Sequence, residues 1–365
     1  MTIVLGFKNL NSKMSNNSVI LSLRDKGEWY NFLKRLPENR KDVYFTSEYY
    51  SLYQNYGDGE ALCFVFEKDN DIAMYPFLKN PITPLGYQLD KEYYDIQGAY
   101  GYNGLISSRD DKIFILAFWK AFDDWCQEND VVAEFMRFHP LLNNQNIASP
   151  KMKTFYSRHT VALDLTDDDI WMHQISSKNR NMIRKAEKEG VTIVESDDYE
   201  TFRKLYDGTM TDLHAEDFYF FPPSYYEEYK KTFKYKSLLC LAMLDGKVIA
   251  GSMFMFSDDY AHYHLSARDR EYSRYAANNL ILWYGIQKAK ERGCKWFHFG
   301  GGTTGEDNDS LLKFKKDFSK TLCEFWIGKR VHNQAVYDCI VEQWKTEHPE
   351  SYEHNRVKLL GYREI

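Results

Sequence analysis

The stretch that decides the fold is "SLLCLAMLDGKVIAGSMFMF", residues 237–256. Two apolar runs flank Asp245-Gly246, and Asp-Gly between such runs indicates a β-hairpin with a tight turn. Outward from it, residues 261–267 predict another strand, residues 278–293 an apolar helix, and residues 294–301 a closing strand. The second half of the chain therefore predicts the order hairpin, strand, helix, strand.

The first half repeats this order. Residues 62–78 predict a hairpin that turns at Asp69-Asn70-Asp71, residues 112–130 an apolar helix, and residues 131–140 a strand. This order resembles the core of the acyl-CoA N-acyltransferases (GNAT), in which two central parallel strands splay apart and admit a substrate. We therefore expect an α/β fold with two GNAT-like (acyl-CoA N-acyltransferase) domains in tandem, each a mixed sheet flanked by helices.

The expected domain boundary lies near residue 160. The chain has 365 residues, which is more than one hydrophobic core usually holds. Residues 141–160 are polar and rich in turn formers, which is typical of a crossover between domains. We expect an N-terminal GNAT-like domain over residues 1–160 and a C-terminal GNAT-like domain over residues 161–365 that carries the transfer site.

Composition excludes several classes of protein. The net charge of −6 argues against a protein that coats nucleic acid by charge alone. The six cysteines contain no C-x-x-C pair, so neither a zinc site nor a disulfide framework is supported, and we predict buried free thiols and no metal. No signal peptide and no apolar run of membrane-spanning length is present, so we expect a cytoplasmic protein without an integral membrane segment.

Glycines follow the closing strand, in "WFHFGGGTTGEDNDSLLKFKKDFS" (296–319). A phosphate-binding P-loop requires Lys and then Ser or Thr after its last glycine, whereas Glu306 follows Gly305 here. We instead expect Gly300 and Gly301 to let an extended substrate approach bare backbone. The basic segment after them predicts a helical turn with its apolar side chains inward and its lysines partly outward: Leu311, Leu312, Phe314 and Phe318 inward, Lys313, Lys315 and Lys316 outward.

Three further stretches are candidates for binding. Ser176 or Ser177 caps a predicted helix on which Arg180 and Arg184 share one face, which suits phosphate groups. The aromatic run 218–226 predicts a lid or an interdomain plug, with Tyr219, Tyr225 and Tyr226 as candidates for substrate contact, and His214 and Asp217 lie beside it as weak candidates for a base. Residues 270–279, "REYSRYAANN", occupy the place of the GNAT pyrophosphate loop but contain no glycine, which leaves Arg270, Arg274 and Asn279 as the candidate cofactor-binding residues.

Taken in order, several of these motifs resemble FemABX-like proteins, the aminoacyltransferases of peptidoglycan bridge formation and the related FemAB- or BioF2-like acyltransferases. The matching motifs are "GYNGL" (101–105), "EFMRFHPLLNN" (134–144), "NRNMIRKAEKEGV" (179–191), "FHFGGG" (297–302) and "LLKFKKDFS" (311–319). The resemblance spans about residues 40 to 330.

The resemblance implies amide formation by transfer of an aminoacyl group from aminoacyl-tRNA to an amine of a cell-wall precursor. No bound cofactor, metal or covalent enzyme intermediate is implied. Lys315, beside Phe314, would lie near the donor end and the developing oxyanion. Arg180 and Arg184 would meet the phosphates of a UDP-muropeptide or lipid-linked acceptor, and residues 219–226 its peptide.

Two alternatives stay open. One is an acyl-CoA-dependent N-acyltransferase that uses acetyl-CoA or another acyl-CoA and acts on an amino sugar or nucleotide-sugar. The other is a non-catalytic GNAT-like module that binds a cell-wall precursor or a partner. The sequence does not name the general base, the acyl group, the acceptor amine or the oligomeric state.

Overall fold

The structure is a computed structural model that describes residues 17–216 and 219–365. Its first half contains seven strands and four α-helices among these residues. Their bounds are β1 Ser18–Ser22, α1 Lys26–Arg35, α2 Ser47–Tyr56, β2 Glu60–Lys68, β3 Asp71–Pro81, β4 Tyr94–Gln97, β5 Ile106–Ser107, α3 Lys112–Glu128, β6 Val131–Arg137, α4 Gln145–Ala148 and β7 Lys153–Asp164.

The second half repeats the alternation of strands and helices. Its elements are α5 Ile170–His173, α6 Ser177–Lys188, β8 Thr192–Ser196, α7 Tyr199–Asp212, α8 Pro223–Thr232, β9 Ser237–Leu244, β10 Lys247–Phe256, β11 Tyr260–Arg268, α9 Ala277–Glu291, β12 Trp296–Gly301, α10 Ser310–Lys316, β13 Thr321–Val331, α11 Gln334–Glu347 and α12 Pro349–Asn355. A six-residue 3₁₀ helix, Arg270–Tyr275, joins β11 to α9.

Both predicted hairpins are present. β2 pairs with β3 around Asp69 and Asn70, and β9 pairs with β10 around Asp245 and Gly246. All four turn residues have positive φ, between 50° and 80°, which is the backbone that Asn, Asp and Gly tolerate in two-residue hairpin turns. The turn chemistry was therefore readable from the sequence.

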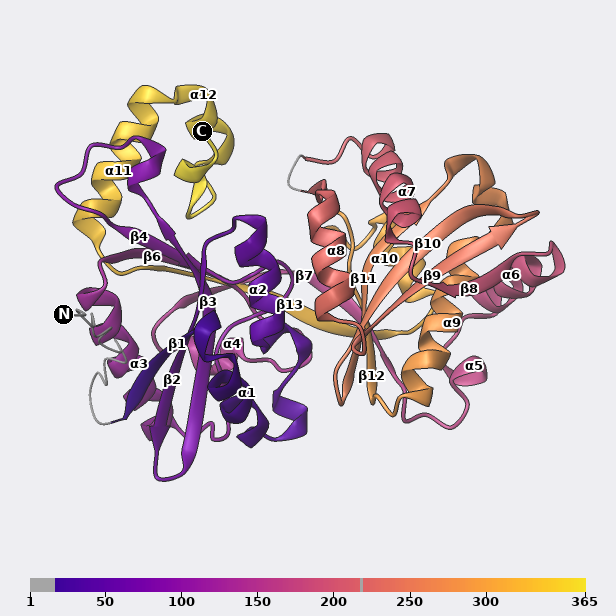
Figure 1. Cartoon of the computed structure of the whole chain (residues 1–365), viewed down its shortest axis with the longest axis horizontal. Helices are drawn as coiled ribbons and strands as arrows, with labels where there is room; N and C mark the ends of the chain where they lie inside the picture. The colour runs from indigo at the N-terminus through magenta and orange to yellow at the C-terminus, as the bar shows by residue number, and fades with distance from the viewer. Residues whose placement is uncertain (1–16, 217–218) are drawn as a thin grey trace, which may run out of the picture.

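The strands of both halves join in one sheet. The order is β1-β2-β3-β4-β6-β13-β7-β12-β11-β10-β9-β8, with β5 paired to β3. The pairs β4–β6 and β11–β12 are parallel and sit at equivalent places in the two halves. Figure 1 shows the two lobes, with β7 and β13 running between them. The strand order confirms the predicted α/β class, with a mixed set of strands in each half and helices on its faces.

Helices cover both faces of this sheet. In β9, the side chains of Leu239 and Leu241 pack with α7 and α8, whereas Leu238 and Cys240 face the cluster that holds α6 and α9. This is the alternation that a strand buried on both faces requires. The cluster under α7 and α8 continues into α1 and α2 of the first half, so one apolar core crosses from lobe to lobe.

The chain returns to the first half at its end. β13 enters the sheet between β6 and β7, and α11 and α12 then pack on the first lobe (Figure 1). The Tyr362 hydroxyl and the Arg363 guanidinium donate hydrogen bonds to the buried Asp95 carboxylate at 2.6 and 2.8 Å. The division into 1–160 and 161–365 stays a prediction, and residues 332–365 lie beside the first of these units.

The segment expected as a polar crossover, 141–160, is only partly a connection. Residues 145–148 form α4 and residues 153–160 belong to β7, because their backbone groups pair with β13. All six cysteines are free thiols, and four are buried as predicted, whereas Cys323 is half-buried and Cys339 is exposed. No helix within the described residues is long and apolar enough to cross a membrane.

Candidate active site

The parallel strands β11 and β12 open like a V. Their pairing runs from Tyr260–Trp296 to His262–His298 and then stops. Beyond that point β11 stays with β10, whereas β12 pairs with β7 through Gly301. We call the gap beyond the last pair the β11–β12 opening, bounded by His264 on β11 and Gly300 on β12. Carboxyl ends of parallel strands are where open α/β sheets bind ligands.

Gly300 leaves this opening free of a side chain. Its φ is +77°, and a Cβ placed there would lie 3.4 Å from Lys315 Nζ and 3.7 Å from the Tyr102 hydroxyl. Three groups from separate segments therefore meet at one point: bare backbone from β12, an amine from α10, and a phenol from the loop between β4 and β5. Gly300 and Gly301 lie where the sequence placed them, at the strand end beside Lys315.

Lys315 is the charged group at this point. Its Nζ donates a hydrogen bond to the Gly301 carbonyl at 2.6 Å and lies 5.8 Å from the Tyr263 ring centroid. Its remaining N–H groups have no other hydrogen-bond partner among the described residues. Burial lowers the pKa of its ammonium to about 7, and the nearby Asp309 carboxylate acts in the opposite direction. The side chain is therefore poised between its two protonation states near neutral pH.

One sequence prediction about this helix was wrong. Lys315 was expected to point partly outward, and Leu311 inward. Lys315 is only 6% exposed, whereas Leu311 is 37% exposed. The reason is that α10 packs against β7 and β12 and turns Leu312 and Lys315 toward the strands. Phe314 is partly buried, with its ring 5.6 Å from that of Phe318.

The acidic loop before this helix has a structural role. Asp309 caps α10: its Oδ1 accepts a hydrogen bond from Leu312 N at 2.9 Å, and its Oδ2 one from Thr304 N at 3.0 Å. A Cβ on Gly302 would lie 2.4 Å from Asp309 Oδ1, so that glycine makes room for the cap. This arrangement fixes the helix that carries Lys315.

The first half contributes aromatic and imidazole groups that the sequence did not single out. Tyr102 lies against His298, with ring centroids 5.0 Å apart, and its hydroxyl has no hydrogen-bond partner among the described residues. Burial, and then the neighbouring His262 and His139, lower the pKa of His298 well below its usual range. "GYNGL" was noticed as a motif, but its contact with β12 depends on the joining of the two halves.

Below the opening, Asp42 holds the two halves together. Its Oδ2 accepts hydrogen bonds from His139 Nε2 at 2.7 Å and His262 Nε2 at 2.6 Å, and its Oδ1 accepts one from Ser257 at 2.7 Å. Burial alone would raise the pKa of Asp42, but the neighbouring histidines hold it well below its usual range. The carboxylate is therefore ionised and shared by both halves.

The donor set of Asp42, His139 and His262 could in principle hold a metal ion, since one ligand atom from each lies within 4.8 Å of the others. The hydrogen bonds argue against it. His139 Nδ1 faces the backbone N–H groups of Leu141 and Leu142 at 3.3 Å each, so the ring proton is on Nε2, which donates to Asp42. A metal ion at His139 Nε2 would require the opposite tautomer.

Arg180 and Arg184 lie on one face of α6, as predicted, and both touch α5. Arg180 Nη1 donates to the carbonyls of Trp171, Met172 and Ile175 at 2.7 to 3.3 Å. Arg184 is exposed, with its guanidinium 5.3 Å from the Trp171 ring centroid. Both arginines therefore have local partners in this structure, and their role at phosphate groups stays a prediction.

The tyrosines of the aromatic run separate. Tyr225 is buried and its hydroxyl lies 3.0 Å from His264 Nε2, so it reaches the opening. Tyr226 is buried against Phe202 and its hydroxyl has no hydrogen-bond partner, whereas Tyr219 is 37% exposed. His214 is exposed, and Asp217 lies outside the described residues.

The segment in place of a pyrophosphate loop is folded on itself. The 3₁₀ helix Arg270–Tyr275 uses its own backbone groups, and Asp269 Oδ1 accepts a further bond from Glu271 N at 3.0 Å. Arg274 donates to the Tyr275 hydroxyl at 2.6 Å, and Asn279 Nδ2 to Asn179 Oδ1 at 2.7 Å. The predicted cofactor contacts of Arg274 and Asn279 therefore compete with partners inside the chain.

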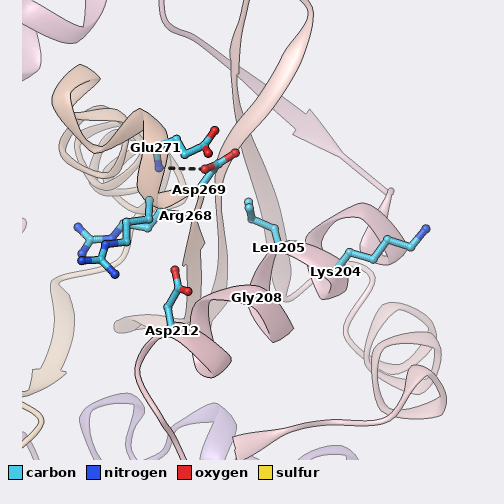
Figure 2. A pocket seen from close by; sticks show the side chains of 8 residues that line it. Lys204, Leu205, Gly208, Asp212, Arg268, Asp269 and Glu271 are labelled. Atoms are coloured by element: carbon cyan, nitrogen blue, oxygen red, sulfur yellow. Dashed lines mark hydrogen bonds between the residues drawn. The ribbon is translucent and has the colours of Figure 1, made fainter.

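A cavity of about 660 Å³ lies between α7 and this segment, with Gly208 and Asp212 on one side and Asp269 and Glu271 on the other (Figure 2). Arg270 also lines it. Acidic and basic side chains share its wall: Lys204, Asp212, Arg268, Asp269, Arg270 and Glu271. Gly208 on α7 adds no side chain, and a Cβ there would meet nothing within 4 Å. This mixed lining does not by itself select a ligand.

Comparison with known proteins agrees with this geometry. Residues 176–316 match the family model of the acetyltransferase (GNAT) domain. The structure named "Crystal structure of FemX" superposes with a TM-score of 0.65, covering 88% of this chain and 98% of that one at 16% identity. The chain has the fold of FemX. The resemblance to FemABX-like proteins is thus confirmed at the level of the fold, over most of both chains.

Two other structures share this FemX-like fold. One is the C-terminal domain of a putative lysylphosphatidylglycerol synthetase from Agrobacterium fabrum, with a TM-score of 0.52, 14% identity, and coverage of 86% of this chain and 94% of that one. The other is L-PGS from Bacillus licheniformis, with a TM-score of 0.52, 15% identity, and coverage of 84% and 92%. No curated protein sequence matches.

The GNAT match spans α6 to α10, and therefore both the β11–β12 opening and Lys315. The prediction of an N-acyltransferase of the GNAT superfamily is confirmed by this match.

Proposed function

We propose that this protein transfers an aminoacyl group from aminoacyl-tRNA to an amine of a peptidoglycan precursor, and that Lys315 stabilises the oxyanion. The observation that carries the proposal is the position of Lys315: a buried amine with free N–H groups, beside bare backbone at the β11–β12 opening. The FemX-like fold and the motifs shared with FemABX-like proteins supply the substrate class.

The reaction requires two substrates held in contact and a site for negative charge. The neutral amine attacks the ester carbonyl, a C–N bond forms, the C–O bond to the ribose breaks, and the amine proton ends on the departing oxygen. A cationic Lys315 faces the oxygen that becomes negative, in a site shielded from water, where such a contact acts strongly. A pKa of about 7 keeps the cation populated at neutral pH.

The donor is the finer part of the proposal. A pyrophosphate loop for CoA offers free backbone N–H groups at a helix start. The loop before α9 closes its own N–H groups in a 3₁₀ helix and carries bulky side chains, with Tyr272 and Tyr275 stacked 5.9 Å apart. This favours an ester of tRNA over an acyl-CoA. The acyl-CoA-dependent reaction on an amino sugar or nucleotide-sugar remains the alternative.

The acceptor is proposed as a UDP-linked or lipid-linked muropeptide. Arg184 is exposed and Arg180 half-buried on the same face of α6, which starts beside α10: Ser176 N donates to the Asp317 carbonyl at 2.9 Å. A phosphate group arriving there would contact the exposed guanidinium of Arg184, and Arg180 would exchange its carbonyl partners for it. Tyr219 precedes α8 and Tyr225 lies in its first turn, and we propose that both contact the peptide.

One experiment tests donor and acceptor together. The purified protein is offered charged tRNA, acetyl-CoA and a UDP-muropeptide, singly and in pairs, and amide products are followed by mass spectrometry. Aminoacyl transfer from tRNA to the muropeptide is expected. Transfer of acetyl from CoA with no aminoacyl product would replace the first proposal by the acyl-CoA alternative. No product with any pair would favour the binding module.

Lys315→Ala tests the role of the lysine. We expect the transfer rate to fall about 10²- to 10³-fold, the usual effect of removing one oxyanion donor. Lys313→Ala is the matched control, because Lys313 is exposed on the same helix, two residues away. Equal rates for the two variants would remove Lys315 from the site. Circular dichroism and thermal unfolding of both variants establish that the fold persists.

A further inference from the structure

Arg137 is the last residue of β6, and the loop between β4 and β5 holds its backbone. Its N–H donates to Asn103 Oδ1 at 2.7 Å, and its carbonyl accepts from Asn103 N at 2.6 Å. The side chain lies over the Phe135 ring, with 4.9 Å between the guanidinium carbon and the ring centroid. Contacts within the first half therefore fix where Arg137 lies.

The guanidinium of Arg137 has no acceptor. Arg137 is half-buried, yet no oxygen among the described residues accepts a hydrogen bond from its side chain or forms an ion pair with it. Its nitrogens are absent from the fully buried polar atoms that lack a partner, so they remain accessible. The other half-buried arginines within residues 17–216 and 219–365 all have acceptors: Arg40, Arg158, Arg180, Arg203, Arg330 and Arg363. A half-buried cation without an acceptor is unfavourable, which points to an acceptor from outside the chain.

Asp58, in the loop between α2 and β2, carries the carboxylate that acts on Arg137. It is also half-buried, and its carboxylate has no hydrogen-bond or ion-pair partner in the described part of the chain. Burial raises the pKa of Asp58 to about 6, and the charge of Arg137 acts against that rise. Burial likewise lowers the pKa of Arg137, against the effects of Tyr100, Tyr219 and Asp58. The two opposite charges thus act on each other without forming an ion pair.

The loop that holds Arg137 also reaches the β11–β12 opening. Tyr102, part of the wall of that opening, directly precedes Asn103, which bonds to the Arg137 backbone. Tyr100, two residues earlier, acts on the Arg137 side chain, as does Tyr219, a proposed contact of the acceptor peptide. Arg137 therefore lies next to the opening, on the side of the first half.

We infer that Arg137 binds the terminal carboxylate of the acceptor peptide while the acceptor amine lies at the β11–β12 opening. The identity of the peptide rests on the proposed function, whereas the anion rests on the unpaired guanidinium. The contact makes Arg137 a specificity-determining residue that favours a peptide ending in a carboxylate over one ending in an amide.

A carboxylate fits this site better than a phosphate group does. The planar guanidinium matches two carboxylate oxygens with two parallel hydrogen bonds. The cost of taking an ion out of water grows with the square of its charge, whereas its attraction to one cation grows only in proportion to that charge. A single guanidinium with the Asp58 carboxylate nearby therefore suits a monoanion.

The anion is tested first, without any transfer. Full-length protein labelled with ¹⁵N-arginine is titrated with N-acetylalanine, with its amide and with inorganic phosphate. The Nε–H signal of Arg137, assigned by its loss in Arg137→Gln, is followed by NMR. We expect N-acetylalanine to shift this signal and the amide to leave it unchanged. No shift with N-acetylalanine, or a larger shift with phosphate at equal concentration, would overturn the inference.

The contact with the acceptor is tested by calorimetry. Kd is measured for a UDP-muropeptide with a free terminal carboxylate and for the same compound with a terminal amide. We expect the amide to bind the wild type about 10- to 100-fold more weakly, the usual effect of losing a hydrogen-bonded charge pair. Arg137→Gln should weaken binding of the carboxylate form by a similar factor and leave binding of the amide form nearly unchanged. Equal weakening of both forms would contradict the contact.

Two further variants separate this contact from general charge. Asp58→Asn removes the opposing carboxylate and should tighten binding of the carboxylate form about two- to fivefold; weaker binding would contradict the inference. Lys329→Gln is the matched control: Lys329 pairs with Phe135 on the same face of the sheet, but its amine already donates to the Val357 carbonyl at 2.8 Å. A loss equal to that of Arg137→Gln would mean that overall charge holds the acceptor.

Stability and transfer complete the test. Arg137→Gln removes an unpaired, half-buried charge, so its melting temperature should equal or exceed that of the wild type. A lower melting temperature with unchanged Kd values would make Arg137 a structural residue. If N-acetylalanine shifts the Arg137 signal but no acceptor is aminoacylated, the proposed function fails and the anion site stands. If acceptors ending in a carboxylate and in an amide bind and react equally well, the inference fails and the proposed function stands.

Discussion

The two parallel strand pairs of this molecule, β4–β6 and β11–β12, have the same topology, but the gap beyond the first is filled and the gap beyond the second is open. In the first half, β4 and β6 part beyond Gln97, and the chain fills the gap with Asn103, which is fully buried. Its Nδ2 donates to the Ala99 carbonyl at 2.7 Å and its Oδ1 accepts from Arg137 N at 2.7 Å. Asn144 seals the same place by donating to the carbonyls of Asn103 and Leu105.

In the second half the equivalent gap is left open and lined with reactive groups. Gly300 adds no side chain, Lys315 Nζ keeps free N–H groups, and Tyr102 and His264 each offer a polar atom without a partner in the described part of the chain. A fold that occurs twice therefore carries one site. The closed copy supports the open one: its residue Tyr102 forms part of the wall of the β11–β12 opening.

The largest effect is expected where the two halves meet. Asp42→Asn should lower the free energy of unfolding by about 3–5 kcal/mol, because it breaks a buried set of charge-assisted hydrogen bonds. Urea unfolding measures it, with the exposed Asp168→Asn as control. A loss below about 1 kcal/mol would mean that the halves are joined by other contacts.

The same variant has a pH signature. The pKa of Asp42 in the folded protein lies below its unfolded value of about 3.9. The contribution of Asp42 to stability is therefore present above that pH and is lost as the pH falls through the folded pKa. Asp42→Asn should therefore flatten the acid side of the stability profile below about pH 4. If the free energy of unfolding falls at acid pH as steeply in Asp42→Asn as in the wild type, other carboxylates cause that fall.

Substitution of one glycine in each gap should have opposite consequences: Gly98→Ala should mainly lower stability, and Gly300→Ala should mainly lower activity. Gly98→Ala puts a Cβ 2.0 Å from the Asn103 side chain and should cost about 2–3 kcal/mol of stability by overpacking the closed gap. Gly300→Ala should cost only about 1 kcal/mol, from its positive φ, yet slow transfer about tenfold or more because its Cβ lies beside Lys315 Nζ. Urea unfolding and transfer rates are measured for both variants. If Gly300→Ala loses stability as Gly98→Ala does and transfers at the wild-type rate, the β11–β12 opening has only a packing role.

The smallest effect concerns Asp309. Asp309→Asn keeps part of the helix cap and should cost about 0.5–1 kcal/mol. It also removes the carboxylate that raises the pKa of Lys315, so that pKa should fall below about 7. If the cation is the active form, activity is lost as the pH rises through this pKa, and the loss should occur at lower pH in the variant. The pH dependence of kcat/KM measures the shift. If the loss of activity at high pH occurs at the same pH in both proteins, a group other than Lys315 causes it.

Much of the fold was predictable from the sequence because its signals are local. Asp245-Gly246 and Asp69-Asn70 carry the backbone preferences of tight turns, and the switch from strand to helix periodicity marks α3 and α9. The strand order was not predictable: β13 enters between β6 and β7 from a distant part of the chain, and no local pattern encodes that pairing.

The site was predicted in part, for the same reason. Lys315 and Gly300 follow one strand closely enough for a motif to contain both. The burial of Lys315 was predicted wrongly because it depends on how α10 packs on β7 and β12. Tyr102, Asp42 and His264 were not selected, since each contacts a residue of the other half that no local pattern places beside it.

By itself the sequence determined the two hairpin–strand–helix–strand units, the bare strand end at Gly300 and the lysine beside it, because turns, periodicity and neighbouring residues act over a few positions. The tertiary structure alone decided which opening is closed and which is free. It also decided the burial of Lys315, which lowers the pKa of its ammonium to about 7, and the meeting of His139 and His262 on Asp42. These properties depend on burial and on hydrogen bonds between residues far apart in the chain, and only the folded chain brings those residues together.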